Sequence, residues 1–224
     1  DALIIYGNYH SNLCRILSAA AYRRGIPCSM VYNMDDVDDS ETSYNSYLIH
    51  AMRVKEFPCH KSEISGAVDQ AKEDFTARGY RPYYIYGNSF GKGNEWVPMQ
   101  AYADVWQDLC AYEKRENLKF DYIFLASSTN MTQSGLLAGQ LAGREQDQKK
   151  CRIVGISVSR NKHRAKEVTV ENLKAYSERI GIVFPPQTES EIFVTDEYLD
   201  GGYGCFRENI LDTIRSAYKT KMEI

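Results

Sequence analysis

The chain has 224 residues, of which 43% are hydrophobic and 25% charged, and its net charge is −3. This composition is typical of a protein with a packed core, in one large domain or two small ones. A slightly acidic chain without a block of Lys and Arg argues against a nucleic-acid partner, and no apolar run approaches the ~18 residues that a membrane span needs.

In the first half, apolar runs alternate with segments of helical periodicity. Strands are expected at 2–7, 28–32 and 83–87, and helices at 12–24, 44–52 and 64–78. The helix at 12–24 carries an apolar stripe that begins with Leu13 and Ile16, and we expect this stripe to join the core. The acidic stretch 33–41 has no periodicity and should be an exposed loop.

The second half repeats this rhythm. Helices are expected at 99–116, 131–143, 165–180 and 205–219, and strands at 121–126, 152–158 and 191–195. Strands interleaved with helices predict an α/β protein with parallel sheets flanked by helices. The break near 88–98 separates a smaller α/β lobe, 1–98, from a second lobe, 99–224, and the ligand site is expected in a cleft between them.

The six cysteines lie far apart and contain no Cys-x-x-Cys pair. Several fall in apolar elements, where a thiol behaves as a small hydrophobe. We therefore expect reduced cysteines in a cytoplasmic protein, and the sequence predicts no metal site.

The stretch "ASSTNMTQSG" (126–135) directly follows "FDYIFL", which is typical of a buried strand. The N–H groups at a helix start are unpaired and attract anions, and the hydroxyl-rich loop adds further donors. An ordinary helix cap is the alternative, but four hydroxyl residues within six exceed what one cap needs. The glycines at 135, 139 and 143 leave a smooth helix face, which we expect to pack on the sheet.

A second polar turn, "YGNYHSNLCR" (6–15), also joins a strand to a helix. Ser11 and Asn12 lie where that helix starts, at the carboxyl edge of the expected sheet. Either residue could be a plain N-cap. Alternatively, Ser11 could act as an acid, base or nucleophile, and Asn12 could hold a ring oxygen or a carboxylate.

Three segments carry a resemblance to a known family. "FDYIFLASSTNMTQSGLLAG", "GNYHSNLCRILSAAAYRRGIPCSMV" and "VTDEYLDGGYG" resemble segments of the pyridoxal-phosphate enzymes related to 1-aminocyclopropane-1-carboxylate deaminase and D-cysteine desulfhydrase. They occur in the family's order and span nearly the whole chain. The resemblance implies a tryptophan-synthase-β-like architecture of fold type II, with pyridoxal 5′-phosphate as cofactor, a small amino acid as substrate and a homodimer as the assembly.

The resemblance also implies roles for particular residues. Asn12 would face the ring hydroxyl of the cofactor, Ser11 would touch the substrate carboxylate or move a proton, and Tyr203 would lie beside the substrate. The residues that would wrap the cofactor phosphate are Ser128, Thr129, Asn130, Met131 and Thr132.

The sequence departs from the family at several points. The family's Schiff-base lysine stands upstream of the Ser-Asn motif, no lysine of this chain matches it, and a C-terminal segment has no counterpart. We therefore expect a fold that is incomplete at both ends. Asn8, His10 and Asn130 replace residues of the family's motifs, although Asn tolerates the positive φ of a turn.

Two other functions stay open. The chain could be a non-catalytic relative that binds pyridoxal phosphate or acts as a scaffold. It could also bind another phosphorylated metabolite at 128–132. The resemblance favours a lyase or deaminase.

Overall fold

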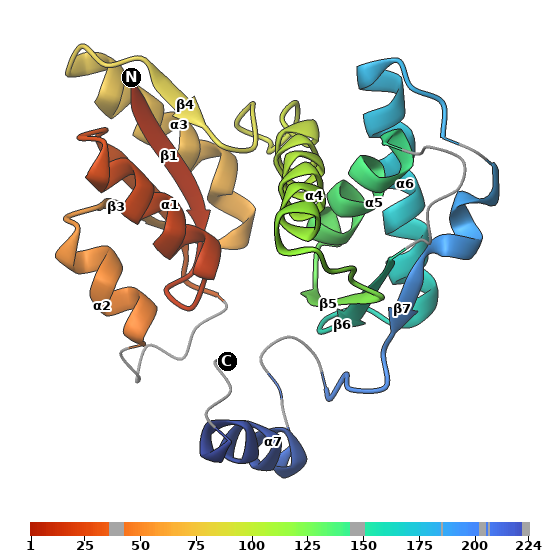
Figure 1. Cartoon of the computed structure of the whole chain (residues 1–224). Coiled ribbons are helices and arrows are strands. Elements are labelled where there is room, and N and C mark those ends of the chain that lie inside the picture. Colours follow the sequence, from red (N-terminus) through yellow and green to blue (C-terminus); the bar gives the residue numbers. More distant parts are fainter. Residues whose placement is uncertain (36–42, 144–150, 185, 202–204, 206, 221–224) are drawn as a thin grey trace. The chain divides into compact units, whose positions relative to one another are not determined.

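A computed structural model describes residues 1–35, 43–143, 151–184, 186–201, 205 and 207–220 (Figure 1). The chain divides into two compact units, Asp1–Glu95 and Trp96–Ile224. Each unit has its own parallel sheet with flanking helices, which confirms the predicted α/β class.

The sheet of the first unit has the strand order β3-β2-β1-β4, and all its neighbouring strands are parallel. Its strands are β1 (Ala2–Gly7), β2 (Cys28–Asn33), β3 (Lys55–Cys59) and β4 (Pro82–Tyr84), and its helices are α1 (Asn12–Arg23), α2 (Tyr44–Ala51) and α3 (Ile64–Ala77). A short 3₁₀ turn, Lys61–Glu63, precedes α3.

Helices cover both faces of this sheet. Ile4 packs with Phe75 of α3, whereas its neighbour Ile5 packs with Ile49 of α2 on the other face. Successive strand residues point to opposite faces, so both isoleucines are fully buried only because each face is covered. Figure 1 shows α3 on one side of the strands, with α1 and α2 on the other.

The second unit has a smaller sheet with the order β5-β6-β7, again parallel. Its strands are β5 (Tyr122–Ser127), β6 (Arg152–Ser157) and β7 (Phe193–Thr195), and its helices are α4 (Trp96–Glu116), α5 (Met131–Ala142), α6 (Lys162–Ile180) and α7 (Glu208–Lys219). A 3₁₀ segment, Pro186–Glu191, leads into β7.

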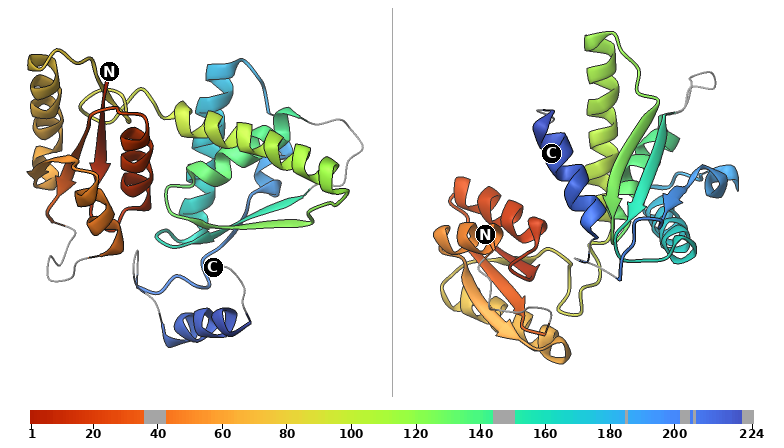
Figure 2. Two further views of the ribbon diagram at one scale, coloured as in Figure 1. Left: turned by 60° about the vertical axis from the view of Figure 1, so that its left-hand side comes forward. Right: turned by 90° about the horizontal axis from the view of Figure 1, so that it is seen from below.

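Helix α5 is the centre of the second unit, since every residue from Gln133 to Leu141 is buried. Leu136, Leu137 and Leu141 form a core with Ile153 of β6. The glycine face of α5 packs on helix α4 and not on the sheet, which corrects the expectation from the sequence (Figure 2). A Cβ on Gly135 would lie 2.7 Å from the carbonyl oxygen of Met99, so only glycine permits this helix contact.

Other differences from the predicted elements are local. Strand β3 was not predicted, because "KEFPC" contains a proline and shows no alternation. Helix α4 begins three residues earlier than expected, since Pro98 is tolerated in a first turn. The predicted apolar stripe of α1 is wrong at its start: Leu13 and Ile16 are exposed, and the buried face begins with Cys14.

Candidate functional site

The loop between β5 and α5 is the main candidate anion site. Ser127 ends β5 opposite Ser157, the last residue of β6, at the carboxyl edge of the sheet. Asn130 then begins α5 with φ 64°, in the left-handed region. Asparagine is one of the few residues other than glycine that adopt this conformation readily, so the sequence supports the turn locally.

The backbone N–H groups of 128–133 donate no hydrogen bond to any residue that the structure describes. The first intrahelical bond comes one residue later, from the N–H of Ser134 to the carbonyl of Asn130, at 2.9 Å. The N-terminal end of the helix dipole adds positive potential at the same place. This loop can therefore hold an anionic group, such as a phosphate, by its backbone.

Hydroxyl groups surround these amides. The Ser128 hydroxyl lies 3.0 Å from that of Ser159, which follows β6, and Thr129 is exposed. The Ser127 hydroxyl is buried and has no partner in the described part of the chain. Residues 157–161 lie at the same edge, because parallel strands end side by side. The sequence did not identify them as part of the candidate site. The available signal was their polar composition at the end of a strand.

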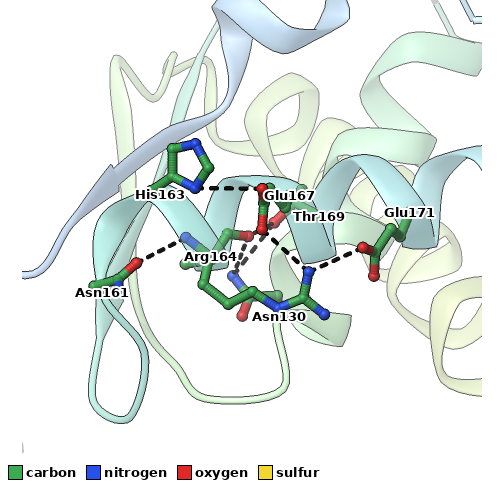
Figure 3. A network of polar contacts seen from close by, with 8 residues as sticks. Asn130, Asn161, His163, Arg164, Glu167, Thr169 and Glu171 are labelled. Atoms are coloured by element: carbon green, nitrogen blue, oxygen red, sulfur yellow. Dashed lines mark hydrogen bonds and ion pairs between the residues drawn. The ribbon is translucent and has the colours of Figure 1, made fainter.

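The side chain of Asn130 points away from the candidate anion site and toward α6. Its amide nitrogen donates to the carbonyl of Ala165 at 3.2 Å and to the hydroxyl of Thr169 at 3.3 Å, both on α6 (Figure 3). Asn130 is almost fully buried. It therefore ties the loop to α6, and only its backbone is available to an anion.

Helix α6, to which the loop is tied, is itself well anchored. Its N-cap Asn161 accepts from the N–H of Arg164 at 2.8 Å. The Arg164 guanidinium bridges Glu167 at 3.1 Å and Glu171 at 3.0 Å along an exposed face (Figure 3). Exposed ion pairs of this kind stabilise a helix only slightly. The positive charge of Arg164 is paired with the two glutamates of its own helix.

The other two residues proposed for the phosphate loop differ in their surroundings. Met131 is half-buried and packs on the core of the second unit, so its side chain holds the helix start in place. Thr132 is half-buried, in the first turn of α5. Tyr203, the residue expected beside the substrate, lies outside the described residues.

The second polar turn, between β1 and α1, belongs to the first unit. Ser11 is the N-cap of α1, and its Oγ accepts from the N–H of Cys14 at 3.2 Å. The Cys14 thiol donates to the carbonyl of Tyr6 at 3.4 Å, and burial raises the pKa of this thiol. A Cβ on Gly7 would lie 2.5 Å from the Cys14 sulfur, so glycine is needed where the strand enters the turn.

Asn12 is exposed, and its Oδ1 accepts from Nδ2 of Asn45 at 3.1 Å and from the Arg15 guanidinium at 3.4 Å. Its own amide nitrogen has no acceptor among the described residues. The Ser11 oxygen accepts in the cap, and the Ser11 side chain also interacts with the Cys14 thiol, which lowers the pKa of that thiol against the larger effect of burial. Among the described residues of this turn, the Asn12 amide nitrogen is thus a side-chain donor without an acceptor.

Two kinds of feature are absent from the part of the chain that the structure describes. No helix there combines the length and apolarity that crossing a membrane needs. No cluster of three or more His, Cys, Asp or Glu side chains there could hold a metal ion.

No protein-family model matches the chain. Among curated proteins, it is 25% identical over 221 residues to 1-aminocyclopropane-1-carboxylate deaminase from Burkholderia multivorans, which covers 96% of this chain and 63% of that protein. The chain thus spans less than two thirds of that relative's length.

Solved structures share the fold. A homologue of 1-aminocyclopropane-1-carboxylate deaminase superposes with a TM-score of 0.75 at 21% identity, over 100% of this chain and 64% of that one. A hydrogen sulfide-producing enzyme from Fusobacterium nucleatum gives 0.53 at 11% identity, over 99% of this chain and 66% of that one. The chain is therefore a distant relative of 1-aminocyclopropane-1-carboxylate deaminase, with the two-sheet fold of the fold-type-II pyridoxal-phosphate enzymes, and it corresponds to part of those proteins.

Proposed function

We propose that the chain is part of a pyridoxal-phosphate-dependent lyase or deaminase that acts on a small amino acid, of the D-cysteine desulfhydrase or 1-aminocyclopropane-1-carboxylate deaminase type. The row of N–H groups at 128–133, which have no acceptor among the described residues, is the observation that carries this proposal. It lies where the sequence resembles the family's phosphate loop, and the sequence similarity to the deaminase extends over 96% of the chain.

The residues of the loop fit the phosphate group of this cofactor. A phosphate ester offers oxygens that only accept when ionised, and 128–133 offer backbone donors at a positive helix end. The hydroxyls of Ser128, Thr129 and Thr132 can add to them. Met131 and Asn130 hold the loop in place through contacts away from the anion.

Pyridoxal phosphate, when bound, supplies an electron sink for negative charge that develops on the substrate. In this proposal Asn12 donates from its amide nitrogen to the ring oxygen of the cofactor. Ser11 donates a hydrogen bond to the substrate carboxylate or moves a proton, and Tyr203 lies beside the substrate. The amine that holds such a cofactor is expected upstream of Ser11, as the resemblance implies. The homodimer and the cytoplasmic location also belong to this proposal.

A non-catalytic relative that binds pyridoxal phosphate or another phosphorylated metabolite, or that acts as a scaffold, is the second candidate. Asn130 favours it, because this residue replaces the glycine expected from the family's loop and binds α6 with its side chain. Release of ammonia from 1-aminocyclopropane-1-carboxylate, or of sulfide from D-cysteine, distinguishes the enzyme from this alternative.

The phosphate site is tested with Thr132→Asp. An acidic residue in the first helical turn favours the helix, so folding is kept. A new negative charge about 6 Å from a phosphate costs about 3 kcal/mol at an effective dielectric constant of about 20, which is about 100-fold in affinity. Thr132→Asn has the same shape without the charge and is the matched control.

Titration with pyridoxal phosphate, followed by absorbance, gives the dissociation constants of the three proteins. Pyridoxal, which lacks the phosphate, is the control ligand, and its affinity should be the same for all three. The proposal is wrong if the unsubstituted chain binds both ligands equally well, or if Thr132→Asp and Thr132→Asn behave alike.

A further inference from the structure

The turn between β1 and α1 is held from outside by the beginning of α2. The Ser43 hydroxyl donates to the carbonyl of Tyr9 at 2.9 Å. Two residues later, the Asn45 amide nitrogen donates to the carbonyl of His10 at 3.0 Å and to Oδ1 of Asn12 at 3.1 Å. These contacts join segments more than 30 residues apart in the chain, as the separation of 33 between Asn12 and Asn45 shows.

These hydrogen bonds determine the orientation of the Asn12 side-chain amide, that is, which of its two ends faces Asn45. A backbone carbonyl can only accept a hydrogen bond, so the atom of Asn45 that meets the carbonyl of His10 must be its nitrogen. The same nitrogen meets Asn12, whose facing atom must then be the oxygen. The Arg15 guanidinium, which can only donate, lies 3.4 Å from that oxygen and selects the same orientation.

The Asn12 nitrogen is consequently turned away from Asn45. It has no acceptor in the described part of the chain, and the side chain is exposed. The backbone N–H groups of Asn12 and Leu13 also have no acceptor there, because the cap from Ser11 serves the N–H of Cys14. The turn therefore presents N–H donors to a ligand, while the acceptor oxygen of the Asn12 side chain faces Asn45.

We propose that Asn45 is a positioning residue that locks the Asn12 amide with its nitrogen outward, so that this turn selects a ligand oxygen that accepts hydrogen bonds, such as an ionised ring hydroxyl. The inference rests on the proposed function, in which Asn12 meets the ring oxygen of the cofactor.

A second anchor keeps the turn folded when Asn45 is changed. The Tyr9 hydroxyl donates to Glu56 of β3 at 2.5 Å, and its ring lies 4.3 Å from that of Tyr32 on β2, between ring centroids. These contacts do not involve Asn45. A variant at Asn45 thus alters the orientation of the Asn12 amide and leaves the turn in place.

Asn45→Asp gives the sharpest test. A carboxylate only accepts, so Asp at this position loses the bond to the carbonyl of His10, attracts the Asn12 nitrogen and turns the Asn12 oxygen outward. The variant also places an acid in the first turn of α2, where it favours the helix. Asn45→Ala removes the anchor without reversing it. Gln70→Glu, an exposed amide-to-acid change on α3, controls for added charge.

Dissociation constants are measured for pyridoxal phosphate and for its analogue without the ring 3-oxygen. We expect Asn45→Asp to weaken the binding of pyridoxal phosphate by about tenfold or more, and Asn45→Ala to weaken it by less. The dissociation constant of Gln70→Glu should be that of the unsubstituted chain. The analogue should bind all the proteins alike. The inference is overturned if Asn45→Asp loses the same affinity for both ligands, or loses no affinity for pyridoxal phosphate.

NMR of the unliganded protein separates this inference from the proposed function. The side-chain amide signals of Asn12 should shift in Asn45→Asp and stay in place in Gln70→Glu. If they do not respond to Asn45→Asp, the inference fails, whatever binds. If they respond but the unsubstituted chain does not prefer pyridoxal phosphate over pyridoxal, the proposed function fails alone.

Discussion

Replacing Gly139 by alanine tests the helix contact that positions the start of α5. A Cβ at Gly139 would lie 2.8 Å from the carbonyl oxygen of Ala103 and 2.7 Å from Cβ of Trp106, both on α4. Ordinary carbon contacts are about 3.5–4.0 Å, so the two helices must move apart by roughly 0.7 Å or more. The oxygen belongs to the backbone and cannot rotate away.

The magnitude follows from two opposing effects. Overpacking of a well-packed interior costs up to about 3 kcal/mol. Alanine favours a helix interior over glycine by about 1 kcal/mol. The net loss of unfolding free energy should be about 2 kcal/mol, which corresponds to a fall in melting temperature of about 4–8 °C for a protein of this size.

The assay uses tryptophan fluorescence, because the sequence contains two tryptophans and both, Trp96 and Trp106, lie on α4. Gly143→Ala is the matched control: its Cβ would lie 3.4 Å from the nearest atom, the carbonyl oxygen of Gly139, in ordinary contact. We expect this control to change stability by less than about 0.5 kcal/mol. If Gly139→Ala is as stable as Gly143→Ala, the close helix contact is refuted.

Two further predictions follow from groups with shifted pKa values. His60 Nδ1 lies 2.6 Å from Asp35, whose hydrogen bond raises the pKa of His60, while the same bond lowers the pKa of Asp35. The stabilisation by His60 is complete below its unfolded pKa of about 6.5 and is lost as pH rises through its higher folded pKa. The stabilisation by Asp35 is lost as pH falls through the lowered folded pKa of its carboxyl group. Melting followed by circular dichroism should show the decline on the alkaline side, and a His60→Gln variant that keeps the same decline would contradict this assignment. Burial raises the pKa of the Cys28 thiol to about 12, whereas Cys205 is exposed, so iodoacetamide at neutral pH should label Cys205 first and Cys28 only after unfolding, as read by peptide mass spectrometry.

The sequence alone determined the alternation of strands and helices and thereby the α/β class. The start of α1 was recoverable because N-cap chemistry is local: Ser11 caps this helix within four residues, through the N–H of Cys14. The starts of α4, α6 and α7 each differ from the expected position by three residues. The polar run after β5 indicated an anion site for the same reason, since a helix start exposes its own N–H groups wherever it lies.

Sequence periodicity did not identify β3, whose strand character depends on its pairing with β2, for example Val31 opposite Phe57. A strand without alternation has no signature of its own, because its hydrogen bonds are made with a partner elsewhere in the chain.

The partners of individual side chains were decided by tertiary structure only. The spacing of the glycines on α5 indicated a close contact, but not that α4 makes it. The tie of Asn130 to Thr169 and the lock of Asn45 on Asn12 join residues 39 and 33 positions apart. Local propensity acts over one or two turns of chain, whereas the direction of a buried or clamped amide depends on donors and acceptors that only the folded chain brings together.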